Sequence, residues 1–295
     1  MDKTFNENYI CKLITDKKTE ALNMARQVLQ HIRELRIPKI NAIWLEVTGC
    51  SGNIISLLEA SEPDVYFMLR EMVNMTYNNS IMAEEGERAY EKFLRTLDTE
   101  FILFVDGAVS LKDNGRYNII ARYKGKEITA MEAVQLAGAK AKYVLAVGAC
   151  ASHGGVSAAN PNPSESVSIN KVLSREVITL PGCPCNPRWV IGTLAHILTK
   201  GRPELNRQNS PVLFYGTTIH DRCPRRSYFD NGIFAQKLGE KTCMFKLGCR
   251  GPVTRTDCPI HKWNDRVNWP IGSNTNCIGC AAFGFPDAME PFVVY

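Results

Sequence analysis

Four short runs of the chain are apolar at nearly every position, a pattern typical of strands buried on both faces of a parallel sheet. They span residues 40–47, 101–107, 142–148 and 177–182. The stretches between them, EPDVYFMLREMVNMTY, EEGERAYEKFLRTL and TAMEAVQLAGAKA, have the length that crossover helices require. The pattern therefore predicts an α/β domain over residues 38–200, built on a flavodoxin-like open parallel sheet.

The chain on either side of this region has a different pattern. Residues 17–36 place apolar side chains at near-helical spacing, which predicts an amphipathic helix within an N-terminal extension of residues 1–37. The segment PRWVIGTLAHILTK (187–200) predicts a helix, and PVLFYGT (211–217) is expected to form a strand. Over residues 201–295 glycine, proline, cysteine and short polar loops dominate. We expect this loop-rich second domain to be held by something other than hydrophobic burial.

Charge and hydropathy narrow the classes of partner. The 35 basic and 30 acidic residues give a net charge of +5 and are spread along the chain, so no nucleic-acid groove is indicated. No stretch approaches the roughly 20 apolar residues of a membrane helix, and the N-terminus lacks an export signal. We expect a cytoplasmic protein, soluble or peripherally membrane-associated. In that reducing compartment the 11 cysteines are metal ligands more readily than disulfides.

Cysteines follow three of the four predicted strands. Cys50 lies in TGCSGN, Cys150 in GACASHGG, and Cys183 and Cys185 in PGCPCNP. Because functional groups gather outside the carboxyl ends of strands in open α/β sheets, separate loops deliver thiolates to one place. Such a set of thiolates can hold an iron-sulfur cluster.

The C-terminal half contains two further ligand sets. The first combines a His-x-x-Cys motif with two later cysteines and consists of His220, Cys223, Cys243 and Cys249. The second ends in Cys-Ile-Gly-Cys and consists of Cys258, Cys277 and Cys280. The spacing alone leaves a structural zinc site open for the first set. Three cysteines suit a zinc site less well, because a closed zinc site has four ligands, whereas a cubane that lacks one iron needs three.

Taken together, the ordered motifs Cys-x-Gly, Gly-x-Cys, Gly-Cys-Pro-x-Asn-Pro, His-x-x-Cys, Cys-x₅-Cys, Cys-Pro and Cys-Ile-Gly-Cys closely resemble nickel-iron hydrogenase small subunits. The resemblance covers residues 40–295 and includes RCPRRSYFDNGIFA, GCRGPVTRTDCP and GFPDAMEPF. It implies a flavodoxin-like domain that holds a proximal cluster, followed by a medial and a distal cluster. It also implies that H2 is oxidised in a separate nickel-iron large subunit.

Carried over residue by residue, the resemblance implies three ligand sets. A distal [4Fe-4S] cluster is assigned to His220, Cys223, Cys243 and Cys249, and a medial [3Fe-4S] cluster to Cys258, Cys277 and Cys280. Pro270 occupies the place of a fourth medial ligand. The proximal cluster is assigned to Cys50, Cys150 and Cys183.

The proximal motif departs from the commoner Cys-x-x-Cys, because its second cysteine falls on Asn53. We favour a three-cysteine [3Fe-4S] cluster, since an amide is a poor iron ligand compared with a thiolate. The alternatives are a [4Fe-4S] cluster completed by Asn53, by water, or by Cys185. Family members with Cys-Ser-Gly-Asn include uptake enzymes that work in air, so oxygen tolerance is a hypothesis.

The resemblance also implies partners. Electrons would pass from the large subunit through the three clusters to an external acceptor, which could be a quinone, a carrier protein or a further subunit, within a higher heterooligomer. The rival interpretations are a cluster-bearing subunit of a complex I-type oxidoreductase and a zinc-stabilised adaptor.

Four other side chains are candidates for a role near the clusters. Asp106 could act at the subunit interface or in a proton relay, or could cap a turn. His153 could hydrogen-bond the proximal cluster or contact the partner subunit, or could be an ordinary loop histidine. Arg225 and Arg226 place positive charge beside the distal set, either to offset cluster charge or to dock an acceptor. His261 is expected to be structural, and Cys11 to be a free thiol.

Overall fold

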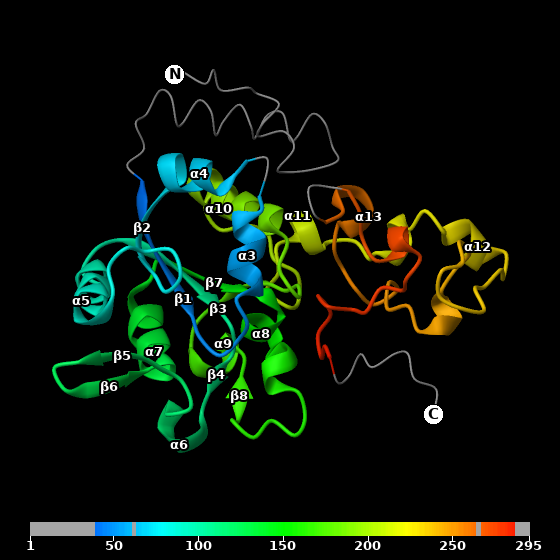
Figure 1. The fold of residues 1–295 in the computed structure, drawn as a ribbon. Helices are drawn as coiled ribbons and strands as arrows, with labels where there is room; N and C mark the ends of the chain where they lie inside the picture. Colours follow the sequence, from blue (N-terminus) through cyan, green and yellow to red (C-terminus); the bar gives the residue numbers. More distant parts are fainter. Residues whose placement is uncertain (1–38, 61–62, 264–266, 287–295) are drawn as a thin grey trace.

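A five-stranded parallel sheet lies at the centre of the fold (Figure 1). The computed structural model describes residues 39–60, 63–263 and 267–286, so the predicted N-terminal helix and Cys11 lie outside the described residues. The strand order β2-β1-β3-β7-β9 is the flavodoxin-like order 2-1-3-4-5. The strands are β1 (Ile40–Glu46), β2 (Val73–Asn78), β3 (Phe101–Asp106), β7 (Tyr143–Val147) and β9 (Ile178–Leu180). The predicted α/β class with an open parallel sheet is confirmed.

Helices cover both faces of this sheet, as the continuous apolar strands require. In β1, Ala42 and Trp44 face a core shared with α3 (Gly52–Leu58) and α10 (Pro187–Lys200). The alternate residues Ile43 and Leu45 face α5 (Gly86–Thr96) and α7 (Ala130–Lys140). Smaller elements complete the domain: β4 (Val109–Ser110), α6 (Lys112–Gly115), β5 (Ile119–Tyr123), β6 (Lys126–Thr129), α8 (Gly148–His153), η2 (Gly155–Ala158), β8 (Ser166–Val167) and α9 (Ile169–Val172).

Two sequence-based element predictions were wrong. The stretch EPDVYFMLREMVNMTY was predicted as one helix, but α4 (Val65–Phe67) and η1 (Met68–Met72) give way to β2 at Val73. Pairing with β1 overrides the helical pattern there, with Val73 opposite Ile40. The segment 211–217 was predicted as a strand but forms the short helix α11 (Val212–Tyr215), whose Tyr215 is buried and donates a hydrogen bond to the Pro181 carbonyl at 3.0 Å.

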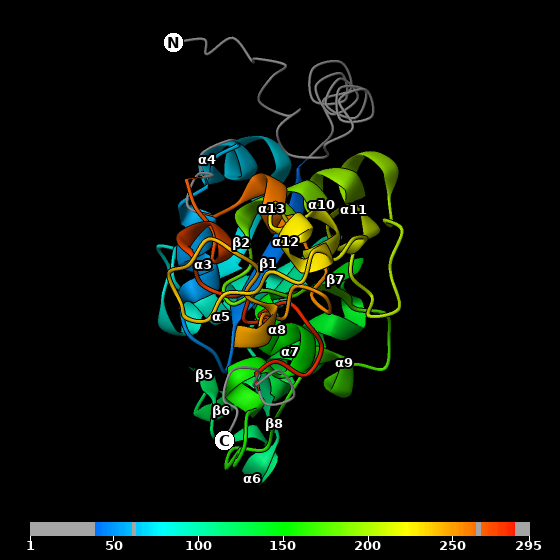
Figure 2. The same ribbon diagram turned by 90° about the vertical axis from the view of Figure 1, so that its right-hand side faces the viewer.

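The C-terminal segment lies against the sheet domain beside α3 and α8 (Figures 1 and 2). Its elements are short and separated by loops: η3 (His220–Arg222), α12 (Arg226–Asp230), η4 (Phe245–Leu247), α13 (Cys258–His261) and η5 (Ile271–Ser273). Its apolar residues Ile219, Trp269 and Ala281 belong to the core cluster that also contains strand residues. The segment therefore shares the core of the sheet domain. Within the described ranges, no helix combines the length and hydropathy needed to cross a bilayer.

Candidate iron-sulfur cluster sites

Three loops at the carboxyl end of the sheet bring Cys50, Cys150 and Cys183 together. Cys50 precedes α3, Cys150 lies in α8 after β7, and Cys183 follows β9. A Cβ atom at Gly52 would lie 3.1 Å from Cys50 Sγ and 3.6 Å from Pro184 Cβ, so the first thiol lies beside the third loop. Although Cys183 keeps solvent contact, partial burial raises its pKa to about 11, and the charges of Cys280, Cys150 and Cys50 contribute. The thiols of Cys50, Cys150 and Cys280 therefore lie near that of Cys183.

Cys280 joins this location from the C-terminal segment. Its thiol accepts a hydrogen bond from the Cys183 backbone N–H. Its charge also raises the pKa of both Cys258 and Cys277, the other members of its sequence-predicted set, although burial is the larger cause for both. Cys280 thus lies between the first-domain thiols and the remaining medial cysteines.

The amide of Asn53 is fully engaged with protein groups. Its Nδ2 donates to Asp106 Oδ1 at 2.6 Å, and its Oδ1 accepts from the Cys185 backbone N–H at 2.7 Å. The side chain is packed tightly, because a Cβ atom at Gly148, where φ is +84°, would lie 2.3 Å from Asn53 Nδ2. Asn53 therefore ties the loops after β3, β7 and β9 to the start of α3.

Cys185 is a core thiol in this structure. It is 1% exposed, belongs to the same core cluster as Trp189 and Tyr215, and its Sγ lies 3.6 Å from the Asn186 carbonyl oxygen. Burial raises the pKa of the thiol strongly, which favours the neutral form over the thiolate that binds iron. Its position supports the interpretation of a buried thiol beside the cluster site.

Two titratable groups lie close to these thiols. Burial raises the pKa of Asp106 to about 7, although the hydrogen bond from Asn53 lowers it. Its Oδ2 has no hydrogen-bond partner among the described residues. Burial lowers the pKa of His153 to about 4, and its ring meets Phe283 of the C-terminal segment edge-on at 5.4 Å. His153 thus bridges α8 and the segment that carries Cys280.

The four residues of the predicted distal set line one small hollow, together with Ile219, Phe245 and Ile271. His220 and Cys223 enter it from η3, and Cys243 and Cys249 flank η4. Burial, followed by the charge of Arg226, lowers the pKa of His220, which favours the neutral imidazole that binds metals.

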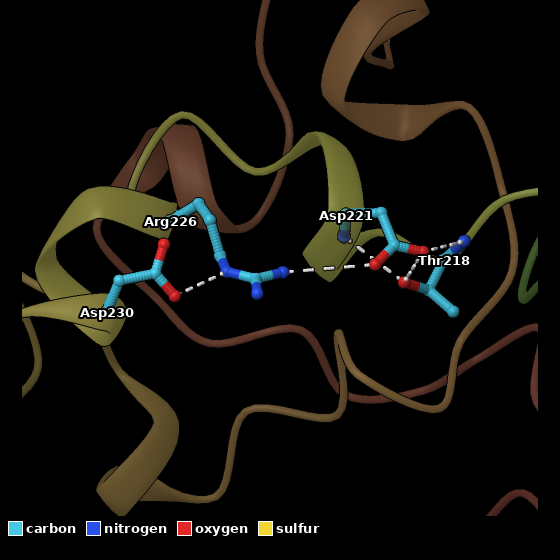
Figure 3. A network of polar contacts seen from close by, with 4 residues as sticks. All are labelled: Thr218, Asp221, Arg226 and Asp230. Atoms are coloured by element: carbon cyan, nitrogen blue, oxygen red, sulfur yellow. Dashed lines mark hydrogen bonds and ion pairs between the residues drawn. The ribbon is translucent and has the colours of Figure 1, made fainter.

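Polar contacts fix Arg226 beside this hollow (Figure 3). Its Nε donates to Asp230 Oδ1 at 2.8 Å, and its guanidinium lies 3.9 Å from Asp221. Asp221 in turn accepts from Thr218 Oγ1 at 2.6 Å. The charge of Arg226 is therefore balanced locally by two carboxylates.

Cys258 and Cys277 are buried between the other two sets. Thr256 Oγ1 donates to Cys258 Sγ at 3.0 Å. Burial raises the pKa of Cys277 to about 12, with contributions from the charges of Cys280 and Cys249. Cys249 belongs to the distal hollow, so the thiols form a continuous series from the sheet edge to the far end of the C-terminal segment.

The donor chemistry of all three sets fits iron-sulfur clusters, because each set consists mainly of cysteine thiols. The residues of the distal set also line a hollow. Over the ranges that the structure describes, no three His, Cys, Asp or Glu side chains converge on a single metal ion. Cluster ligands need not converge in this way, since they surround an inorganic core of several atoms.

One buried network had no signal in the sequence. Trp189 Nε1 in α10 donates to Asp257 Oδ1 at 2.6 Å, and His261 Nδ1 lies 2.7 Å from Asp257 Oδ2. Asp257 directly precedes Cys258, so the network fixes a cysteine of the predicted medial set to a helix of the sheet domain. The expected structural role of His261 agrees with this position.

Two protein families match different parts of the chain. Residues 215–293 match the family of C-terminal domains of NiFe/NiFeSe hydrogenase small subunits, and residues 50–197 match the family "NADH ubiquinone oxidoreductase, 20 Kd subunit". The second match is confined to the sheet domain, whereas the first covers the loop-rich segment.

Similar proteins cover most of the chain. The periplasmic [NiFe] hydrogenase small subunit of Solidesulfovibrio fructosivorans is 34% identical over 85% of this chain and 81% of its own length. The uptake hydrogenase small subunit of Azotobacter vinelandii is 35% identical over 88% of this chain and 74% of its own. The reduced, active [NiFeSe] hydrogenase of Desulfomicrobium baculatum gives a TM-score of 0.82 at 34% identity, covering 86% of this chain and 98% of that one. The actinobacterial-type NiFe-hydrogenase of Ralstonia eutropha gives 0.79 at 26% identity, covering 86% and 81%.

Proposed function

This chain belongs to the small subunits of nickel-iron hydrogenases, the electron-transfer subunits that pair with a large subunit, and we propose that it transfers electrons through three iron-sulfur clusters. The observation that carries the proposal is the series of thiols from the sheet edge to the distal hollow. Cys183 and Cys280 link the first set to the second, and Cys277 and Cys249 link the second to the third. The loop-rich segment with its own ligand sets distinguishes this chain from the complex I-type alternative.

The three sets correspond to proximal, medial and distal clusters. We assign the proximal cluster to Cys50, Cys150 and Cys183, the medial cluster to Cys258, Cys277 and Cys280, and the distal cluster to His220, Cys223, Cys243 and Cys249. When bound, the clusters supply the one-electron chemistry. The protein supplies ligands, burial and hydrogen bonds such as the one from Thr256 to Cys258.

We propose that the proximal cluster has three protein ligands and is [3Fe-4S], with a [3Fe-4S] medial and a [4Fe-4S] distal cluster. Two observations support a proximal cluster with only three protein ligands. Both polar atoms of the Asn53 amide are hydrogen-bonded, and Cys185 is buried in the core. Of the thiols outside the proximal set, Cys280 lies beside Cys183. Its effect on the pKa of Cys258 and Cys277 supports its assignment to the medial cluster.

Electron paramagnetic resonance of the purified complex, with iron counted per chain, tests the proposal. Oxidised [3Fe-4S] centres carry a detectable spin, whereas oxidised [4Fe-4S] centres are usually silent. We expect two such spins in the oxidised complex and one additional signal after reduction. A single oxidised spin would show that the proximal cluster holds four irons, and bound zinc without cluster signals would overturn the hydrogenase assignment.

The variant Asn53→Cys sharpens this experiment, because it places a thiol at the position of the commoner motif. We expect it to remove one oxidised [3Fe-4S] spin and to add one iron per chain. The conservative variant Asn53→Gln is the control, since it adds no thiolate. An unchanged spin count in Asn53→Cys would contradict the proposed iron-deficient proximal site.

Other expectations remain proposals. Three relatives are named as periplasmic, and cell fractionation tests the cytoplasmic location proposed for this chain. The domain limits 38–200 and 201–295, the external acceptor, the higher heterooligomer and activity in air also remain predictions. Rapid loss of H2 oxidation by the complex under air would contradict oxygen tolerance.

A further inference from the structure

Aromatic rings surround the outer side of the distal histidine. The His220 ring meets Phe229 edge-on at 4.5 Å, and Phe229 meets Phe245 at 5.2 Å and Phe234 at 5.9 Å. Phe245 is 45% exposed, so this aromatic group continues from the cluster site to the surface. Ile233 and Leu238, from the same part of the chain, are 48% and 59% exposed. Exposed apolar side chains around a redox site are typical of a surface that another molecule covers.

This end of the molecule also holds most of its net charge. Residues 218–250 contain seven Lys and Arg against three Asp and Glu, which gives +4 of the chain's total of +5. The loop between Phe234 and Cys243, which pair as a bridge, carries exposed Lys237 and Lys241. Lys246 is exposed, and its Nζ lies 4.9 Å from the centre of the Phe234 ring.

The contacts separate these lysines from the two neighbouring arginines. Arg225 points inward and donates to the carbonyls of Glu240, Thr242 and Ile271, and Arg226 is balanced by Asp221 and Asp230 (Figure 3). No ion pair with an acidic side chain is formed by Lys237, Lys241 or Lys246 among the described residues. Arg225 therefore stabilises the fold around the cluster, and the three lysines leave positive charge at the surface.

We propose that this surface docks a small acidic electron-carrier protein, with Phe245, Ile233 and Leu238 as its apolar contacts and Lys237, Lys241 and Lys246 as its charged contacts. The inference rests on the proposed function. In each docking event one electron would pass from the distal cluster, held by His220, Cys223, Cys243 and Cys249, to the oxidised centre of the carrier. Oxidation of one H2 in the large subunit releases two protons and two electrons, so two carriers are reduced per H2.

The test uses the complete hydrogenase complex and two forms of one carrier. A basic c-type cytochrome and the same cytochrome with succinylated lysines carry the same haem but opposite surface charge. At low ionic strength we expect kcat/KM to be at least about tenfold higher for the succinylated form, because complementary charge accelerates association. The advantage should disappear near 0.5 M salt, where screening acts within roughly 4 Å.

Matched lysine variants locate the effect. Lys246→Glu should lower kcat/KM for the succinylated cytochrome several-fold, and Lys237→Glu/Lys241→Glu/Lys246→Glu should reverse the preference between the two forms. Lys124→Glu is the control, because Lys124 also lies over an aromatic ring, at 5.0 Å from the centre of Tyr123, but in the β5–β6 hairpin. H2 oxidation with a small viologen dye should be equal in all these variants.

Two kinds of result would contradict docking of an acidic carrier at this surface, and a third would contradict the proposed function. Equal rates for the two cytochromes, or lysine variants that behave like Lys124→Glu, would overturn the docking proposal. It would also be overturned if the lysines governed only binding to phosphatidylserine vesicles, since the surface would then contact a membrane. Absence of dye-linked H2 oxidation in the wild-type complex would instead contradict the proposed function.

Discussion

Asn53 Nδ2 donates a hydrogen bond to Asp106 Oδ1 at 2.6 Å in the interior of the protein, three residues after Cys50 in the chain. The position where the family resemblance would place a second cysteine is thus used here to connect the strand loops. The stability and the redox behaviour of the protein should both depend on this contact and on the buried networks around it.

The close approach of Gly148 to Asn53 can be tested by adding one methyl group. In Gly148→Ala the new Cβ atom would lie 2.3 Å from Asn53 Nδ2. In Gly125→Ala, at a similar φ of +77°, the new Cβ atom would meet no atom within 4 Å. We expect Gly125→Ala to cost about 1 kcal/mol from backbone strain and Gly148→Ala about 2 kcal/mol more from overpacking. The thermal midpoint of the complex measures both. Equal midpoints for the two variants would contradict the contact.

Asp106 should make stability depend on pH. Its pKa is about 7 in the folded protein and near 3.8 when exposed, so the folded state binds more protons between these values. Stability therefore falls as pH rises through this window, by up to about 4 kcal/mol at roughly 1.4 kcal/mol per pKa unit. Asp106→Asn should flatten this dependence. Thermal midpoints at pH 5 and pH 8 measure it, and the same slope in both proteins would exclude Asp106 as its source.

The hydrogen bond from Trp189 to Asp257 can be isolated by comparing two buried tryptophans. Trp189→Phe removes the donor to Asp257, whereas Trp44 Nε1 has no partner among the described residues, so Trp44→Phe removes none. Both rings are fully buried. We expect Trp189→Phe to be less stable than Trp44→Phe by about 1–3 kcal/mol, because a buried acceptor loses its partner. Thermal unfolding of the two complexes decides, and equal losses would show that the hydrogen bond contributes nothing.

Thr256 is expected to set the potential of the medial cluster. Its hydroxyl donates to Cys258 Sγ at 3.0 Å, and such hydrogen bonds favour the more negatively charged, reduced state of a cluster. Thr256→Val should lower the medial potential by tens of millivolts, since about 59 mV corresponds to a tenfold change for one electron. Thr193→Val is the control, because the Thr193 hydroxyl is buried without a partner among the described residues. A potentiometric titration followed by electron paramagnetic resonance should show a shift for Thr256→Val alone.

Much of the fold was predictable because the sequence patterns that specify its strands and helices are local. The apolar runs that became β1, β3, β7 and β9 are continuous, and the predicted helix 187–200 coincides with α10 (Pro187–Lys200), which begins at a proline after an Asn186 cap. The first-domain cysteines were expected together because parallel strands end at one edge of a sheet.

The errors and omissions depend on distant parts of the chain. The helical pattern before Asn78 gave no sign that Val73 pairs with Ile40 of β1. Nothing in the spacing of Cys280 indicates its contact with the Cys183 backbone, and the bond from Cys185 to Asn53 joins residues 132 positions apart. Such contacts are set by tertiary packing, which a local pattern does not encode.

The hydrogen bond from the Cys183 backbone to the Cys280 thiol bears on how many electrons the two neighbouring sites can hold at once. Its donor belongs to a residue that we assign to the proximal cluster and its acceptor to one that we assign to the medial cluster, so the two proposed clusters would share an electrostatic environment. An electron on either cluster opposes the arrival of a second on its neighbour, since like charges repel strongly in a low-dielectric interior. With both clusters bound, Cys183 and Cys280 would thus favour single occupancy of the pair, and the two electrons of each H2 would leave one after the other.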